Sequence, residues 1–155
     1  MLKMFFVVAL SVIISGCSRV NESQILAESA IAEVTKVEAT GKANNYTFSV
    51  TIDSPDTGCN SYADWWEVIT PDGELIYRRV LLHSHVDEQP FTRTGGAVAI
   101  QPQEEVIVRV HMSSSGYSQQ AQQGSIQSGF TTVTLPQNLA NNLESVEPLP
   151  ENCAF

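Results

Sequence analysis

Positive charge is scarce in this chain of 155 residues, which has 8 lysines and arginines against 17 aspartates and glutamates and a formal net charge of −9. The basic residues form no cluster, so the sequence lacks the electrostatic footprint that binding to DNA or RNA requires. It also lacks a Gly-x-Ser-x-Gly element, a phosphate-cradling glycine loop and a nucleotide signature. We therefore expect neither a nucleic-acid partner nor an enzyme.

The sequence also lacks an apolar run of the roughly 20 residues that a transmembrane helix needs. The run at 4–14 (MFFVVALSVII) is shorter and ends in Ile14-Ser15-Gly16-Cys17. This ending resembles the lipobox of bacterial lipoproteins, in which an aliphatic residue and two small residues precede a cysteine. The resemblance implies that residues 1–16 are a lipoprotein signal peptide, removed before a lipidated Cys17. An ordinary signal peptide is the alternative.

The expected subcellular location follows from this lipid anchor. Residues 17–30 form a polar, lipidated tether, and several acyl chains such as palmitate hold a membrane far better than one, because each buried methylene adds about 0.8 kcal/mol. Ser18 rather than Asp follows the cysteine, which favours the outer membrane. We expect an extracytoplasmic protein in the cell envelope, anchored to the outer membrane and facing the periplasm.

Cysteine is limited to three residues. With Cys17 bearing lipid, Cys59 and Cys153 remain as an even pair in an oxidising compartment, which favours a disulfide. Closing a loop of about 95 residues contributes about 4–5 kcal/mol in the chain-entropy model. Two free thiols are the alternative.

Convincing amphipathic helices are absent, and short strand-like runs recur about every ten residues instead. Residues 46–53 (YTFSVTID) alternate apolar and polar side chains, which predicts a strand with one buried face. Pro71-Asp72-Gly73 predicts a hairpin turn. The pattern predicts a single antiparallel, immunoglobulin-like β-sandwich of about seven strands over 31–135, with a small barrel as the alternative. The expected strands are 31–40, 46–53, 62–70, 74–85, 97–100, 105–112 and 130–135, with a mobile polar loop at 113–129 and an irregular tail at 136–155.

Four segments resemble a family of uncharacterised bacterial exported domains. They are SPDTG (54–58), YADxWEV (62–68), RVLLHxHVxEQPFTR (79–93) and VRVH (108–111). The resemblance spans about 31–135 and implies an exported β domain without implying an activity. The chain departs from the pattern after His111, where MSSSGY (112–117) lacks the acidic residue and second histidine of the family.

Two of the three histidines are spaced H-x-H. On a strand such positions face the same way, so His83 and His85 could bind one ion. His111 on another strand could add a third nitrogen and Glu88 a carboxylate for zinc, whereas histidines alone would suit copper. Structural histidines without any cofactor are the competing interpretation. The spacing is also near a cupin motif, with one residue too few before Glu88.

Charged side chains allow two further interpretations. Arg79, Arg93 and Arg109 could form a cationic patch that binds a carboxylate or phosphate, or they could make cross-strand ion pairs with Glu67 or Glu88. Four acidic residues near the expected hairpin are interpreted as solvated, rather than as a general acid and base or a calcium site. They are Asp64, Glu67, Asp72 and Glu74.

These patterns favour a non-enzymatic binding or envelope-associated module that presents a sheet face or loop edge to an unknown protein or small molecule. Copper or zinc binding by the H-x-H histidines is the second hypothesis.

Overall fold

The computed structural model describes residues 31–154, so the expected signal peptide, the tether and Cys17 lie outside the described part. No helix within residues 31–154 is long and apolar enough to cross a membrane. The described elements are β1 (Glu33–Lys42), β2 (Asn45–Asp53), β3 (Ala63–Ile69), β4 (Leu75–Val80), β5 (Phe91–Val98), β6 (Val106–Met112), β7 (Gly116–Tyr117), β8 (Gln120–Ser125), β9 (Gly129–Thr134) and the 3-10 helix η1 (Asn141–Ser145).

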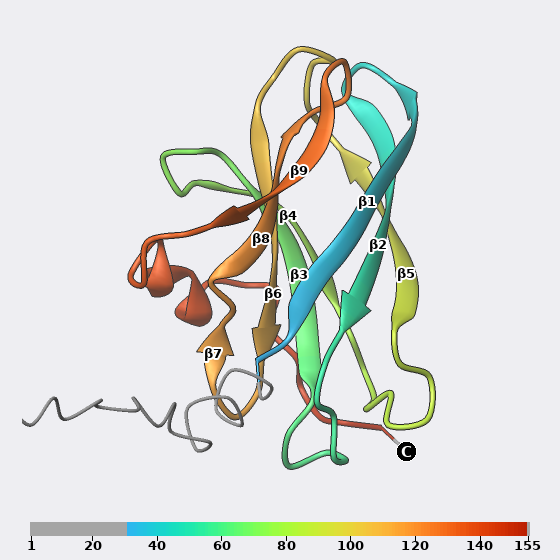
Figure 1. The fold of residues 1–155 in the computed structure, drawn as a ribbon, viewed down its shortest axis with the longest axis vertical. Coiled ribbons are helices and arrows are strands. Elements are labelled where there is room, and N and C mark those ends of the chain that lie inside the picture. Colours follow the sequence, from blue (N-terminus) through green and yellow to red (C-terminus); the bar gives the residue numbers. More distant parts are fainter. Residues whose placement is uncertain (1–30, 155) are drawn as a thin grey trace, which may run out of the picture.

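Two antiparallel sheets form the sandwich (Figure 1). The smaller sheet has the order β1-β2-β5, and the larger has the order β4-β3-β6-β8-β9 with β7 beside β6. Between them, Phe48, Val50 and Ile52 of β2 pack in one core with Trp66 of β3 and Val108 of β6. The all-β antiparallel sandwich predicted from the sequence is therefore confirmed, although the described part contains nine strands rather than about seven.

The central strands β3 and β6 are buried along their whole length, on both faces. Their inner faces contact the core, and their outer faces lie under the C-terminal segment that follows β9. Leu143 of η1 packs in a second apolar cluster with Ile69, Ile107, Ala121 and Leu135. The tail is irregular apart from η1, as expected, but it acts as a third layer over the larger sheet.

A buried carboxylate lies at the centre of this outer layer. Glu67 of β3 stands directly opposite Arg78 of β4 and Arg109 of β6 in the strand register. Arg78 donates to Glu67 at 2.6 and 2.8 Å, and Arg109 donates to it at 2.9 Å. Two guanidinium groups against one carboxylate leave one net positive charge in a buried place, which requires further acceptors.

The tail supplies those acceptors. Arg109 donates to the main-chain oxygens of Leu139 and Ala140. Arg78 donates to three further carbonyls, those of Leu143, Val146 and Pro148. Each guanidinium also lies over an aromatic ring, 4.5 Å from the centroid of Trp65 for Arg78 and 3.5 Å from that of Tyr117 for Arg109. The tail is thus held through its backbone carbonyls as well as through the side chain of Leu143.

Two expectations are corrected by this arrangement. Asp64 and Glu67 are buried, and only Asp72 and Glu74 are exposed as expected. Residues 113–129 are not a mobile loop, because they contain β7 and β8. The polar strand β8 is stable in the sandwich because the buried amide of Gln122 donates to the Val34 oxygen and to Thr132 Oγ1.

The fourth strand is also shorter than the expected 74–85. It ends at Val80 because the next strand, β5, belongs to the other sheet, and residues 81–90 cross between the two. His83 and His85 therefore lie in a loop and not on a strand face.

Replacing Glu67 by Gln is expected to destabilise the fold by about 3–5 kcal/mol, because it leaves two buried guanidinium groups without a countercharge. Urea denaturation at pH 7 would measure this loss, with Glu74→Gln, an exposed position on the same hairpin, as the matched control near zero. A loss below about 1 kcal/mol would contradict the central role of this carboxylate.

Candidate functional site

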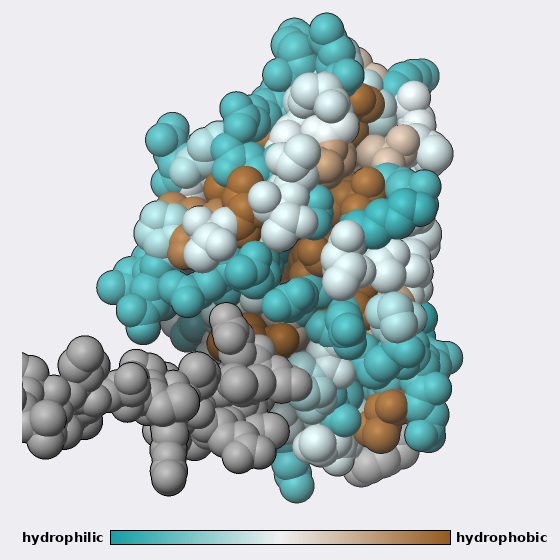
Figure 2. Space-filling model, in the orientation of Figure 1, coloured by the Kyte–Doolittle hydropathy of each residue, from teal (hydrophilic) through white to brown (hydrophobic). Residues whose placement is uncertain are grey.

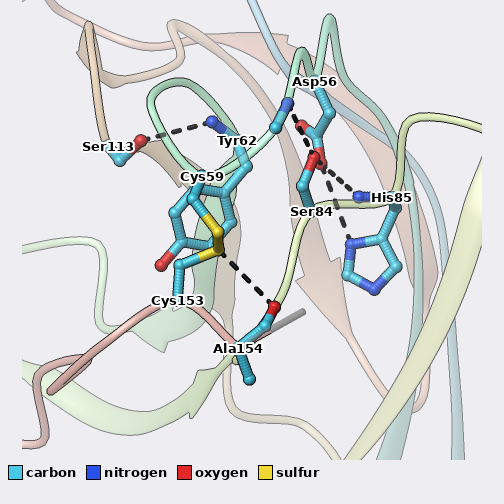
Figure 3. Close-up of a disulfide and its surroundings, with 9 residues drawn as sticks. Asp56, Cys59, Tyr62, Ser84, His85, Ser113, Cys153 and Ala154 are labelled. Carbon is cyan, nitrogen blue, oxygen red and sulfur yellow. Dashed lines mark hydrogen bonds and ion pairs between the residues drawn. A yellow bond between two sulfur atoms is a disulfide. The ribbon is translucent and has the colours of Figure 1, made fainter.

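The crossing loop 81–90 is organised by a second buried carboxylate, that of Asp56. Asp56 Oδ1 accepts from Ser54 Oγ at 2.7 Å and from the Ala63 N–H at 2.9 Å. Asp56 Oδ2 accepts from the His85 N–H at 2.8 Å and from Ser84 Oγ at 3.4 Å (Figure 3). One carboxylate therefore joins the β2–β3 loop to the β4–β5 loop.

Gln89 makes the second connection between the same two loops. Its Oε1 accepts from the Ser54 N–H at 2.8 Å, and its Nε2 donates to Ser54 Oγ at 3.1 Å and to the His85 oxygen at 3.0 Å. Every polar atom of this side chain that points inward is therefore satisfied. The loop holds a defined shape although it has no regular secondary structure.

The His85 side chain lies inside this loop and is only 2% exposed. Its ring stacks on Phe91 at 3.8 Å between centroids, and the ring of His83 lies 4.5 Å away. Neither ring nitrogen of His85 has a hydrogen-bond partner among the described residues. The nearest carboxylate oxygen, Asp56 Oδ2, is 3.8 Å from Nδ1, beyond hydrogen-bonding distance.

Burial keeps His85 neutral. Desolvation, followed by the positive charges of Arg93 and His83, lowers the pKa of His85 to about 4. The imidazole is uncharged at neutral pH and keeps one nitrogen lone pair available. A neutral histidine with no internal partner can accept a hydrogen bond or bind a metal ion.

A pocket of about 400 Å³ adjoins His85. The disulfide between Cys59 and Cys153, with an S–S distance of 1.99 Å, forms one wall of it. Ala154 donates its N–H to the Leu82 oxygen and so holds this part of the tail beside the loop. The pocket is lined by Gly58, Cys59, His83, Ser84, His85, Val86, Asp87, Glu88 and Ala154.

His111 does not join the other two histidines. Its Nδ1 is 2.6 Å from Asp64 Oδ1, and its ring stacks on Trp65 at 3.7 Å, on the outer face of the larger sheet. Within residues 31–154, no three or more histidine, cysteine, aspartate or glutamate side chains are grouped to hold a metal ion. The third imidazole that the metal hypothesis allowed is therefore not supplied by His111, whereas His83 and His85 do lie together.

The three arginines do not form a common patch either. Arg109 is buried against Glu67, and Arg93 donates to Glu88 at 2.6 Å. Arg79 is exposed on β4. Of the two interpretations of these charges, ion pairing with Glu67 and Glu88 matches the contacts of Arg109 and Arg93.

The residues that build the loop were not found from the sequence. Asp56 and Gln89 occur in segments that read as turn and loop, and Phe91 precedes the strand expected at 97–100. A signal existed in the hairpin: counting back from the turn at Asp72-Gly73 places Glu67 opposite Arg78, which predicts their ion pair.

Comparison with curated proteins finds similarity to a protein of Halomicrobium mukohataei named "Putative lipoprotein", which is 40% identical over 106 residues. The match covers 68% of this chain and 51% of that protein, so the chain spans about half the length of the relative. No family model matches the sequence, and no solved structure matches it. The resemblance to exported bacterial domains therefore stays a prediction.

The stability of the domain is expected to fall between pH 7 and pH 5 through His85. Its pKa is about 4 in the folded state and near 6.5 in the unfolded chain, so the unfolded chain takes up a proton first as the pH falls. Urea denaturation would measure the free energy of unfolding at both pH values. From pH 7 to pH 5 the native protein should lose about 1–2 kcal/mol more than the variant His85→Phe, which keeps the ring stack. The exposed control His83→Gln removes only a smaller cause of the lowered His85 pKa and should retain most of the native pH dependence. Equal slopes for all three proteins would contradict the assignment.

Proposed function

We propose that this chain is a lipid-anchored lipoprotein whose immunoglobulin-like sandwich acts outside the cytoplasm as a non-enzymatic binding module. The Ile14–Cys17 motif, the name of the similar protein and a disulfide suited to an oxidising compartment support this proposal. Ser18 favours a location at the outer membrane, facing the periplasm.

The observation that carries the binding role is the unpartnered imidazole of His85 beside the pocket. Buried polar groups are nearly always hydrogen-bonded, and leaving one unpaired costs about 1–3 kcal/mol. The surrounding loop satisfies Asp56 and Gln89 fully yet leaves both nitrogens of His85 unpartnered. A ligand in the pocket would supply the missing partner, once a small movement of His83 or Glu88 admits it.

Binding is favoured over catalysis by the orientation of the same groups. In a nucleophile–base–acid arrangement, a histidine nitrogen contacts both a hydroxyl and a carboxylate. Here Ser84 Oγ and Asp56 contact each other, and Asp56 accepts from the backbone N–H of His85 rather than from its ring. The loop therefore has the residue types of hydrolytic chemistry without its contacts.

Copper or zinc is a second candidate, because His83 and His85 are adjacent. Their ring centroids are 4.5 Å apart, Glu88 lines the same pocket, and His85 is neutral and needs no deprotonation to coordinate. His111 is not part of this site. Within the described residues these three side chains are not grouped to hold an ion, so binding would require Glu88 to turn from Arg93 toward the rings. Two imidazoles and a carboxylate would then leave at least one position for water or a substrate ligand.

Cys17→Ser is expected to abolish lipidation. Cells that express the full chain and are fed an alkyne analogue of palmitate should label the native protein, and the labelled protein should enter the detergent phase of a Triton X-114 separation. The variant should stay unlabelled and remain in the aqueous phase. Label that survives in the variant would show that Cys17 is not the acceptor, and Cys59→Ser in parallel controls for thiol-dependent labelling.

Zinc or copper added to the full chain in detergent should bind with one-to-one stoichiometry in calorimetry if the metal candidate is right. His83→Ala removes an exposed ligand without disturbing the core and should weaken binding by about tenfold or more. His111→Ala, which changes a histidine outside the pocket, should leave the affinity unchanged. Heat equal for His83→Ala and the native protein would end the metal candidate and leave the pocket to an organic ligand.

A further inference from the structure

Ile31, which directly follows the expected tether, lies at the same end of the sandwich as the crossing loop 81–90. In the smaller sheet, Glu33 at the start of β1 pairs with Asp53 at the end of β2, and Ile52 pairs with Phe91 at the start of β5. Since the three strands are antiparallel, Ile31 and loop 81–90 lie two strands apart at one end of the domain (Figure 1). The β8–β9 hairpin lies at the opposite end (Figure 1).

Exposed aliphatic side chains gather at that tether end. Four large hydrophobic residues of the described part are exposed, and three of them are Leu82 at 56%, Val86 at 52% and Ile31 at 42%. Leu82 and Val86 project from a loop that Asp56 and Gln89 hold in shape. The face in Figure 2 is largely hydrophilic around its central hydrophobic band, with an isolated hydrophobic patch near the lower end.

We infer that this end docks on the bilayer that carries the anchor, with Leu82 and Val86 inserted among the lipid headgroups. The inference rests on the proposed lipidation of Cys17. Thirteen residues lie between Cys17 and Ile31, and a chain of that length spans at most about 50 Å. Tethering keeps the local concentration of membrane high, so a contact made by two aliphatic side chains is sufficient to orient the domain.

The acidic side chains at this end determine which lipid headgroups it can approach. Asp87 and Glu88 directly follow Val86. Glu88 is paired with Arg93 at 2.6 Å, whereas Asp87 has no ion pair within residues 31–154. Carboxylates at the surface are repelled by anionic headgroups, so the contact depends on apolar insertion into a zwitterionic interface. Docking would also turn the pocket beside His85 toward the membrane, so its ligand would be reached from the interface.

Tryptophan quenching tests this orientation on the lipidated full chain in phosphatidylcholine vesicles that contain brominated phosphatidylcholine. The native residues Trp65 and Trp66 are buried and give the background signal. A probe at Val86→Trp should be quenched about threefold or more above a probe at Gln127→Trp, which lies in the β8–β9 hairpin. Ser115→Trp, on the β6–β7 turn at the same end as Ile31, is a control for nearness to the membrane. If loop 81–90 docks, the probe at position 86 should be quenched more than the probe at position 115. Adding Leu82→Glu to Val86→Trp should reduce the quenching at least to the Ser115→Trp level.

Flotation of the same vesicles distinguishes a failure of the proposed lipid anchor from a failure of the proposed docking. Protein that floats with the vesicles but shows equal quenching at all three probes keeps the anchor and overturns the docking, which would leave loop 81–90 to a protein partner. Protein that does not float contradicts the lipid anchor and the docking together. Near-ultraviolet circular dichroism of each variant checks that these exposed substitutions leave the fold intact.

Discussion

The pairing of Glu67 with two arginines determines how the rest of the structure is arranged. A carboxylate on a central strand, buried on both faces of its sheet, requires donors from both neighbouring strands, and the register supplies Arg78 on one side and Arg109 on the other. The positive charge left over requires acceptors, which are five backbone carbonyls of the tail. The outer layer of the sandwich is therefore a consequence of one buried charge.

This route of the tail leads to the candidate site. After its carbonyls satisfy Arg78, the tail continues to Cys153, which is bonded to Cys59, and to Ala154, which bonds the Leu82 oxygen. Ala154, together with Cys59, lines the pocket beside His85. The tail, which forms part of the pocket wall, is thus attached to the sandwich at two places. Arg78 and Arg109 hold it over the outer face, and the disulfide holds it at the end where β1 begins. A ligand bound there as proposed would meet walls that are largely preformed, with only the side chain of His83 or Glu88 having to move.

The sequence predicted what depends on local pattern. Alternation identified β2 and β6 almost to the residue, and the cysteine count favoured a pairing that the structure contains. Burial of charge was missed, because Glu67, Arg78 and Arg109 look like surface residues until three strands are placed side by side. β8 was missed because the glutamines of QAQQGS carry no apolar alternation, and its stability comes from partners about 10 and 88 positions away. The expected third imidazole was misplaced for a related reason, because His111 lies on the outer face of the larger sheet, against Asp64 and Trp65.

The two buried carboxylates and the buried histidine differ in how well their hydrogen-bonding groups are satisfied. Glu67 and Asp56 each accept at least three hydrogen bonds, so the charged groups with the highest desolvation cost are compensated. His85 is equally buried and has none. Since an apolar ring would stack on Phe91 just as well, packing alone does not require a histidine there. A residue kept polar at a stability cost, in a loop otherwise fully bonded, is the pattern expected where an external group completes the structure.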